Sequence, residues 1–326
     1  MGNLDGRVAI ITGAGQGIGR EHALFFASEG ARVVVNDPGV AIDGSGGDSS
    51  LAQRVVDEII AAGGEAVAHT DSIADWEGAR SLVYRAVEAF GDLHVVVNNA
   101  GILRNELLVN MNEQEFDAVI AVHLKGTFAV NHWASVYWRD QFKAGSQADR
   151  AIVNTSSSSG LHNPLPTEVN YAAAKAGVAA MTTVAAIELR PYHVRVNCIA
   201  PSRARTRATV DVPGISGAPQ GEQFDPFHPG NVSPLVGYLS MADCPFNGQV
   251  FSVHGGTVIR YHEWSLGEEI HSDHQWNIAE LVRAMETLPN VDPLAHLIGA
   301  LGVLGPEEQA QMQHMIEARL IQERSA

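Results

Sequence analysis

The sequence predicts a doubly wound α/β fold, in which helices cover both faces of a parallel sheet. Between Val8 and Val253, short β-branched runs alternate with segments of helical length. The runs are continuously apolar, as in strands that are buried on both faces. The segments between them are long enough for right-handed helical crossovers, which wind such a sheet in both directions.

The strands and helices of this part follow from the spacing of apolar residues. Strands are predicted at 8–11, 33–35, 66–69, 95–97, 151–154, 194–198 and 249–253. Helices are predicted at 19–29, 51–62, 76–90, 113–139 and 171–190. Both sets have the lengths and periods expected of a parallel sheet with helical crossovers.

Three stretches interrupt the alternation. Residues 38–50 are rich in Gly, Asp and Ser and predict an extended loop, and residues 208–234 carry repeated Pro and Gly and predict a mobile one. Beyond residue 262 the strand pattern ends, and 277–287 and 307–322 predict amphipathic helices. We expect one α/β domain at 1–262 and a helical extension at 263–326 that packs on it or on a partner subunit.

The composition excludes several classes of protein. The 326 residues are 45% hydrophobic, with 37 acidic against 21 basic side chains and a net charge of −16. Such a charge argues against nucleic acid or an anionic membrane as the main partner. Two cysteines, Cys198 and Cys244, cannot form a disulfide framework. No leader pattern and no apolar run near ~18 residues are present, so we expect a cytoplasmic protein without a membrane span.

A glycine-rich motif follows the first predicted strand. Residues 12–19 read TGAGQGIG and open the first predicted helix. A tight turn at this junction points backbone N–H groups and the helix dipole at a pyrophosphate. The alternative is a plain glycine-rich turn, but the position between strand and helix favours a dinucleotide site.

Asp37 bears on the choice of cofactor. It follows the second predicted strand, 18 residues after Gly19. A carboxylate there accepts hydrogen bonds from the adenosine ribose and repels a 2′-phosphate. The glycine-rich motif also contains no Arg or Lys. Both features favour NAD over NADP, unless Asp37 is merely a turn residue before Pro38.

Tyr171 and Lys175 lie one helical turn apart in the predicted helix at 171–190. A free tyrosine has a pKa near ~10 and is a poor base at neutral pH. A neighbouring ammonium stabilises the phenolate and lowers that pKa, which suits proton transfer to or from an alcohol. The glycine-rich motif and the serine run at 156–159 support the interpretation of this pair as an acid–base centre.

These motifs resemble those of the short-chain dehydrogenase/reductase family. The matching segments are TGAGQGIG (12–19), NNAG (98–101), the serine run, YAAAK (171–175) and NCIAPS (197–202). Within the family, VVDEIIAAGGEAVAHTDS (55–72), VVVNNAGILRN (95–105) and VHLKGTF (122–128) are most similar to one group. That group is the (3R)-hydroxyacyl-CoA dehydrogenase part of peroxisomal multifunctional enzymes of type 2, also called 17β-hydroxysteroid dehydrogenase type 4.

The resemblance implies a site. The implied cofactor-binding residues are Gly13, Gly15, Gln16, Gly17, Ile18, Gly19, Asp37, Asp71, Ser72, Asn98, Ala100, Gly101, Tyr171, Lys175, Pro201 and Thr206. It makes Tyr171 the acid/base, Lys175 its partner and a serine the group that polarises the substrate oxygen. Counting from Gly160 gives Ser157 and counting from Tyr171 gives Ser158; we prefer Ser157. His123 stands where the family commonly has a catalytic Asn, so we expect it in a proton relay that titrates on the acid side of neutrality, or in a structural role.

Two further groups admit a functional and a structural interpretation. Arg203, Arg205 and Arg207 alternate at the expected substrate mouth, where they would meet coenzyme A phosphates or form structural salt bridges. His271 and His274 have the spacing of metal ligands, but no further ligands accompany them, and we expect no metal.

The sequence therefore predicts an NAD-dependent oxidoreductase that interconverts a secondary alcohol and a ketone. The substrate expected from the resemblance is a 3-hydroxyacyl-CoA or a hydroxysteroid, which connects the protein with lipid metabolism. The alternatives are an NADPH-dependent ketoacyl reductase and a catalytically silent, nucleotide-sensing regulator. The expected partners are a small-molecule substrate and further copies of the chain in a dimer or tetramer.

Overall fold

The computed structural model describes residues 2–209, 215, 217–219, 223–262, 268–271, 275, 278–289, 297 and 305–322. The chain divides into two compact units, Met1–Arg260 and Tyr261–Ala326. The first unit contains the predicted α/β domain, and the second contains the predicted extension.

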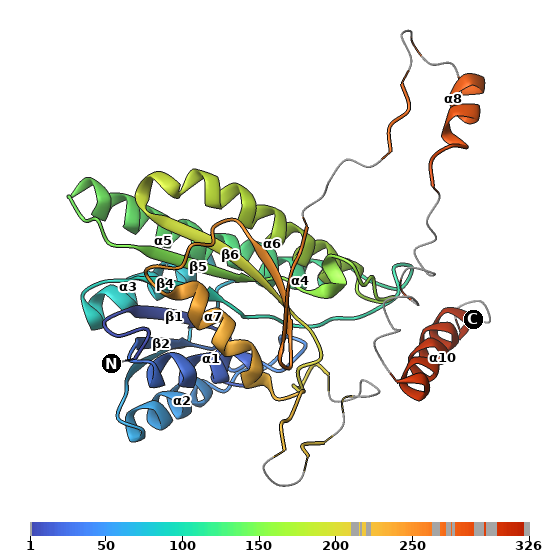
Figure 1. The fold of residues 1–326 in the computed structure, drawn as a ribbon. Coiled ribbons are helices and arrows are strands. Elements are labelled where there is room, and N and C mark those ends of the chain that lie inside the picture. The colour runs from blue at the N-terminus through green and yellow to red at the C-terminus, as the bar shows by residue number, and fades with distance from the viewer. Residues whose placement is uncertain are drawn as a thin grey trace. The chain divides into compact units, whose positions relative to one another are not determined.

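A single mixed sheet forms the centre of the first unit (Figure 1). In the described part of the chain its strands follow the order β3-β2-β1-β4-β5-β6-β7-β8. The parallel strands are β1 (Val8–Thr12), β2 (Arg32–Asn36), β3 (Glu65–His69), β4 (Val95–Asn98), β5 (Arg150–Thr155), β6 (Val194–Pro201) and β7 (Val250–His254). β8 (Thr257–Arg260) is antiparallel to β7.

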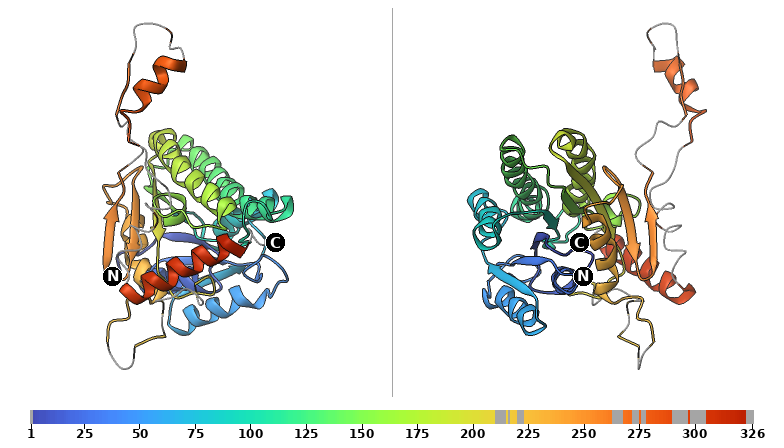
Figure 2. Two further views of the ribbon diagram at one scale, coloured as in Figure 1. Left: turned by 90° about the vertical axis from the view of Figure 1, so that its right-hand side faces the viewer. Right: turned by 60° about the vertical axis from the view of Figure 1, so that its left-hand side comes forward.

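Helices cover both faces of the sheet (Figures 1 and 2). One face carries α1 (Gly17–Ser28), α2 (Ser50–Ala61) and α7 (Ser233–Ser240). The other carries α3 (Trp76–Phe90), α4 (Glu113–Ile120), α5 (Thr127–Lys143) and α6 (Val169–Glu188). The short helices are η2 (Ser158–Gly160), η3 (Arg190–Tyr192) and η4 (Pro229–Val232). The predicted doubly wound, Rossmann-like fold is confirmed.

Three elements differ from the prediction. The single helix expected at 113–139 is interrupted by a π-helical turn, η1 (Ala121–Gly126). Strand β8 was not predicted, because all four of its residues are exposed and give no core pattern. Helix α7 begins inside the stretch expected to be a loop, because Pro234 starts a helix here rather than breaking one.

The order of the strands places a crevice at their carboxyl ends. β1 pairs with β2 on one side and with β4 on the other, so the chain winds outward in opposite directions from this point. Ligands of open α/β sheets bind outside the carboxyl ends at such a switch point. The glycine-rich motif follows β1, and the serine run follows β5, at this same edge.

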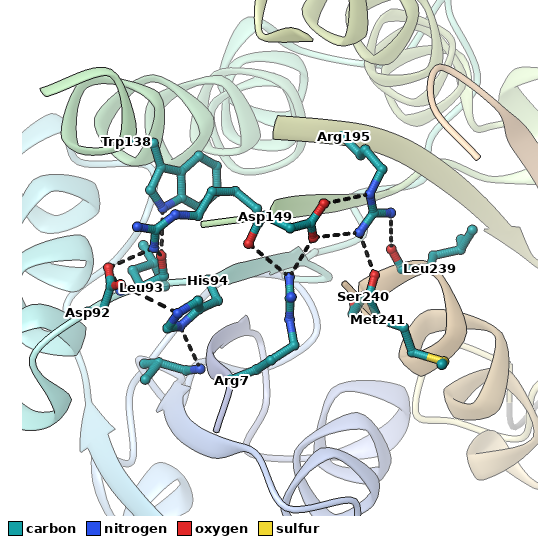
Figure 3. A network of polar contacts seen from close by, with 12 residues as sticks. Arg7, Asp92, Leu93, His94, Trp138, Asp149, Arg195, Leu239, Ser240 and Met241 are labelled. Carbon is teal, nitrogen blue, oxygen red and sulfur yellow. Dashed lines mark hydrogen bonds and ion pairs between the residues drawn. The ribbon is translucent and has the colours of Figure 1, made fainter. Parts of the chain in front are cut away.

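The opposite, amino edge of the sheet is closed by a charged network (Figure 3). Asp149 accepts hydrogen bonds from Arg7 at 3.2 Å and from Arg195 at 3.0 Å. Arg195 also donates to the carbonyls of Leu239 and Met241, where α7 ends. Because Arg7 precedes β1 and Arg195 lies in β6 and also contacts the end of α7, Asp149 links β1 with β6 and, through Arg195, with α7, away from the crevice.

The second unit contains two described helices. α8 (Ile278–Met285) and α10 (Pro306–Gln322) fall where the sequence predicts amphipathic helices. Ile278 and Val282 are exposed on α8. The packing of this extension stays a prediction. Among the helices that the structure describes, none is long and apolar enough to cross a membrane.

Candidate active site

The glycine-rich loop is shaped by close contacts that only glycine permits. Gly13 has φ +63°, and a Cβ there would lie 2.6 Å from Cα of Ala100. A Cβ on Gly19 would lie 2.2 Å from the Gly13 carbonyl oxygen. Gln16 is the extended N-cap of α1, and no side chain caps this helix terminus. The loop therefore leaves a side-chain-free cradle at a helix N-terminus, which fits a pyrophosphate.

Asp37 lies against this loop. Its Oδ2 accepts a 2.8 Å hydrogen bond from Gly15 N and its Oδ1 a 2.7 Å bond from Gly39 N. The carboxylate thus holds the glycine-rich loop and its own turn together, which agrees with the structural interpretation. Each carboxylate oxygen has a second lone pair, so ribose hydroxyls can still donate to it.

The NNAG segment packs on the glycine-rich loop through Ala100, which the sequence predicted at the site, and through Thr12 and Asn99, which it did not. Thr12 Oγ1 accepts 3.0 Å bonds from the backbone N–H groups of Asn99 and Ala100. Asn99 Nδ2 donates to the carbonyl oxygens of Thr12 and Gly13. The place of Asn99 inside NNAG is the signal that could have identified it.

Asn98 was expected along the cofactor wall, but its side chain points into a buried amide cluster. Its Nδ2 donates to Asn131 Oδ1 at 2.6 Å and to Asn154 Oδ1 at 2.9 Å. Asn154 in turn donates to Thr182 on α6. The side chain of Asn98 therefore ties β4 to β5 and α5, and only its backbone remains to face a cofactor.

Asp71 and Ser72 lie beyond the carboxyl end of β3, on the crevice side of the sheet. The Asp71 carboxylate accepts from Ser81 Oγ at 2.8 Å, and Ser72 Oγ accepts from Ala74 N at 3.3 Å. Both residues are exposed. They lie beside β2 and Asp37, where the adenine half of a dinucleotide would lie.

Ser157 and Tyr171 are in direct contact. The Ser157 side chain lies close enough to the Tyr171 hydroxyl to lower the pKa of Tyr171, and its Oγ accepts a 3.2 Å hydrogen bond from Ser159 N. Ser157 is extended and caps η2, whereas Ser158 lies within η2. Of the two serines left open by counting, the structure brings Ser157 to the tyrosine.

Lys175 lies under the tyrosine, one turn further along α6. Its Nζ donates a 2.6 Å hydrogen bond to the Thr155 carbonyl and lies 5.6 Å from the centre of the Tyr171 ring. Burial lowers the pKa of Lys175 to about 8. Burial also raises the pKa of Tyr171 to about 12, against the opposing hydrogen bond of Ser157. The lowered tyrosine pKa expected from the sequence is thus not found in this structure, because desolvation, together with the charge of Glu168, outweighs the opposing effect of Ser157.

Glu168, which the sequence reasoning missed, lies next to this centre as the N-cap residue of α6. Its carboxyl hydrogen-bonds to the Ser159 side chain and accepts a 3.4 Å bond from Asn105 Nδ2. Its Oε2 is buried without a hydrogen-bond partner in the described part of the chain. Burial raises the pKa of Glu168, and its charge raises that of Tyr171.

His123 lies in the π-helical turn and packs against the tyrosine. The two rings meet edge to face, with centres 5.0 Å apart. His123 Nε2 lies 3.1 Å from Ile102 N and 2.8 Å from Ile102 O, and a Cβ on Gly101 would clash with the ring. Burial lowers the pKa of His123 to about 3, with Lys175 contributing. A buried imidazole with this pKa stays neutral near pH 7, which disfavours a titration of His123 near neutrality; its part in a relay stays a prediction.

The segment after β6 covers the glycine-rich loop. Thr206 Cγ2 lies 3.6 Å from where a Cβ on Gly17 would stand, and Thr206 N donates to Thr209 Oγ1 at 3.0 Å. Pro201, the last residue of β6, begins the segment. Both residues predicted here therefore lie on the crevice side, and Thr206 lies next to the first turn of α1.

The three arginines of this segment have different surroundings. Arg205 forms an ion pair with Asp225, as the structural interpretation holds. Arg207 is exposed and donates to the Val40 carbonyl at 3.3 Å. Arg203 has a left-handed backbone, with φ +54°. The sequence cluster is therefore not one site.

No group of three or more metal-ligating side chains occurs in the part of the chain that the structure describes. His271 is exposed there, and His274 lies outside the described residues.

Together, a dinucleotide cradle and a Ser–Tyr–Lys set at one sheet edge define a nicotinamide-dependent oxidoreductase site. Residues 7–213 match the model of the family described as short chain dehydrogenase. The chain belongs to this family, as its motifs predicted.

The relatives extend the comparison. A hydroxyacyl-CoA dehydrogenase of Mycobacterium tuberculosis is 46% identical over 263 residues, which cover 78% of this chain and 80% of that protein. The peroxisomal multifunctional enzyme type 2 of Drosophila melanogaster is 40% identical over 79% of this chain, but only 40% of that enzyme is covered. A 3-oxoacyl-[acyl-carrier-protein] reductase of Thermotoga maritima is 36% identical over 78% of this chain and 99% of that protein.

A solved structure has the same fold. The crystal structure of a short chain dehydrogenase from Mycobacterium avium is 48% identical in sequence and superposes on this chain with a TM-score of 0.78. The superposition covers 89% of this chain and 98% of the Mycobacterium avium chain.

Proposed function

We propose that this chain is an NAD-dependent dehydrogenase that interconverts the secondary hydroxyl and the ketone of a 3-hydroxyacyl thioester. The observation that carries the proposal is that Tyr171 lies beside Ser157 and has Lys175 Nζ 5.6 Å from the centre of its ring. The relative from Mycobacterium tuberculosis is named a hydroxyacyl-CoA dehydrogenase, which supports the substrate class.

The chain's own residues account for the proton and for substrate orientation. A bound nicotinamide dinucleotide would supply the acceptor for the hydride that leaves the carbinol carbon. Ser157 Oγ hydrogen-bonds to the substrate oxygen, and the phenolate of Tyr171 takes the hydroxyl proton; in reduction Tyr171 returns it. Lys175 supplies the positive charge that favours the phenolate. His123, as a neutral imidazole, holds the Gly101–Ile102 backbone and the edge of the Tyr171 ring in place.

Asp37 supports NAD as the cofactor. Its carboxylate lies at the end of β2, held by Gly15 N and Gly39 N, where an ionised acid opposes a 2′-phosphate. Gly13, Gly15, Gly17 and Gly19 would hold the pyrophosphate on the N-terminus of α1.

The second candidate is a ketoacyl reductase that uses NADPH. The similarity to the reductase from Thermotoga maritima supports this candidate. The hydrogen bond that Asp37 already accepts from Gly15 N also supports it, because this bond competes with one from the ribose of NAD. The negative charge of Asp37 argues against it. A silent, nucleotide-sensing regulator is disfavoured because the Ser–Tyr–Lys set is intact. A hydroxysteroid is the alternative substrate. We also propose that the protein is cytoplasmic and forms a homodimer or homotetramer.

One substrate panel tests these alternatives. The full chain is assayed by NADH or NADPH absorbance with 3-hydroxyacyl-CoA, a 17β-hydroxysteroid and a simple secondary alcohol, in both directions. We expect the highest kcat/KM for the thioester with NAD. A higher kcat/KM for 3-ketoacyl reduction with NADPH would establish the reductase instead, and no turnover of any alcohol would favour the regulator.

A further inference from the structure

Arg203 and His254 emerge side by side from neighbouring strands at the crevice edge. Pro201 of β6 is in register with Val253 of β7, and Ser202 N donates a 3.1 Å hydrogen bond to the Val253 carbonyl. Arg203 follows two residues after Pro201, and His254 follows directly after Val253. Both side chains therefore start from the same corner of the sheet, on the side of the crevice.

Arg203 is unusual for its backbone and for its lack of a partner. Its φ of +54° is a conformation that residues with a Cβ seldom adopt, and such strain is retained chiefly at functional positions. Its guanidinium is partly buried and makes no hydrogen bond or ion pair with any described residue. The nearby carboxylate, Asp225, is already taken by Arg205. In a chain with a net charge of −16, a partly buried cation without an acid is unexpected.

His254 adds a polar atom that also lacks a partner. Its Nδ1 is buried and has no hydrogen bond in the described part of the chain. Burial lowers the pKa of His254, and the charge of Arg203 lowers it further. The imidazole is therefore neutral near pH 7 and has one N–H to donate. An anion between the two side chains would satisfy the guanidinium and that N–H together.

The position of this pair relative to Ser157 limits what the anion can belong to. Ser157 lies beyond β5, β6 comes next, and β7 with His254 follows. Arg203, which follows β6, is therefore one strand spacing from the end of β5, or about 5 Å, and His254 is two spacings away, or about 10 Å. The thioester carbonyl of a 3-hydroxyacyl group is only two bonds from the reacting carbon, so it lies too close to that carbon to reach Arg203 and His254. A phosphate at the end of a long pantetheine arm can reach this distance, and a steroid carries no such group.

We propose that Arg203 and His254 bind a phosphate of the coenzyme A portion of the substrate, an inference that rests on the proposed thioester dehydrogenase function. In this arrangement Arg203 supplies the charge and His254 one hydrogen bond. Arg205 has the structural role of anchoring the loop to Asp225.

The test compares three thioesters of the same 3-hydroxyacyl group: coenzyme A, 4′-phosphopantetheine and N-acetylcysteamine, which has no phosphate. Arg203→Met should raise KM for the coenzyme A thioester about 10- to 100-fold, because the loss of a hydrogen bond to a charged group weakens binding by about that factor. It should change KM for the N-acetylcysteamine thioester by less than about twofold. If Arg203→Met also raises KM for the 4′-phosphopantetheine thioester, the phosphate bound is the one next to pantetheine.

Two matched controls accompany Arg203→Met: one removes an arginine elsewhere on the surface, and the other keeps a positive charge at position 203. Arg190→Gln deletes an exposed arginine just before β6, at the amino edge. It should leave both KM values unchanged, whereas Arg203→Lys should give an intermediate KM. His254→Gln provides a second variant in case Arg203→Met does not fold. Equal effects of Arg203→Met on the charged and uncharged thioesters would overturn the proposal.

A direct binding measurement separates this inference from the proposed function. Calorimetry of free coenzyme A is performed on wild-type protein with saturating NAD, so that the dinucleotide site is filled. Binding that Arg203→Met weakens about 10-fold or more supports the anion site even if no thioester is oxidised. If thioesters are oxidised but free coenzyme A binds both proteins equally, the anion site fails while the proposed function stands.

Discussion

The Lys175 ammonium lies 5.6 Å from the centre of the Tyr171 ring while it donates a 2.6 Å hydrogen bond to the Thr155 carbonyl. The lysine is thus fixed by β5 and not by the tyrosine. Burial sets the tyrosine pKa high and the lysine pKa low, so each charged form depends on what else occupies the site. This relationship makes the acid–base behaviour of Tyr171 the property most open to measurement.

Removal of the Tyr171 hydroxyl should abolish most of the catalytic activity and leave cofactor binding intact. Tyr171→Phe should lower kcat by about 10²- to 10⁴-fold, the usual contribution of general acid–base catalysis. Its affinity for NAD, measured by fluorescence titration, should remain near that of wild type. Tyr84→Phe, an exposed tyrosine on α3, serves as the control. A Tyr171→Phe enzyme with more than a tenth of the wild-type activity would rule out this role.

The carboxyl of Glu168 should influence the pH profile through the tyrosine. Burial raises the pKa of Glu168, and once ionised its charge raises the pKa of Tyr171. Glu168→Gln removes that charge, so Tyr171 should deprotonate at lower pH. The rising limb of kcat/KM against pH for alcohol oxidation should therefore shift toward acid. Glu88→Gln, an exposed change on α3, should not move it, and an unshifted or alkaline limb in Glu168→Gln would contradict the assignment.

Cofactor preference depends on the charge of Asp37. Wild-type protein should prefer NAD strongly over NADP, and Asp37→Asn should narrow the ratio of the two kcat/KM values by about tenfold or more. Because Asp37 also binds Gly15 N and Gly39 N, some loss of stability should accompany the change. Steady-state kinetics with both cofactors measures this, and equal wild-type efficiencies would show that Asp37 does not meet the ribose.

The network at the amino edge should contribute to stability and not to catalysis. Asp149→Asn leaves Arg7 largely buried without its anion and should lower the free energy of unfolding by about 3 kcal/mol. Asp140→Asn breaks an exposed pair with Arg139 and should cost less than about 1 kcal/mol. Denaturant unfolding checks both variants, and similar midpoints would show that burial gives Asp149 no special value.

The extension can be tested by truncation after Arg260, the last residue of β8. Its helix α8 exposes Ile278 and Val282, and apolar side chains of this kind are seldom left in water. We expect the truncated chain to show a lower Tm, a changed mass in solution or a raised KM. An unchanged value of all three would exclude packing of the extension on the α/β unit or on a partner.

The parallel strands, most of the helices and the candidate acid–base residues could be predicted from the sequence. This was possible because buried parallel strands leave continuous apolar runs, and because TGAGQGIG and YAAAK place chemistry on local geometry, a strand-to-helix turn and one turn of helix. These features depend on neighbours a few residues apart. Strand β8 was missed because an exposed edge strand carries no core pattern. Helix α7 was missed because Pro234 begins the helix, whereas the repeated prolines of residues 208–234 predicted a loop.

Which side chains meet depends on contacts between residues far apart in the sequence, and these follow from the folded chain. Counting left Ser157 and Ser158 open, and folding brings Ser157 to Tyr171 because it stands extended at the end of β5. The arginines of one short segment separate because Arg205 meets Asp225, twenty residues away, while Arg203 does not. Burial, which no local pattern reveals, set the pKa of His123 to about 3. Desolvation and long-range contact depend on the whole packed chain, so they appear only once it is folded.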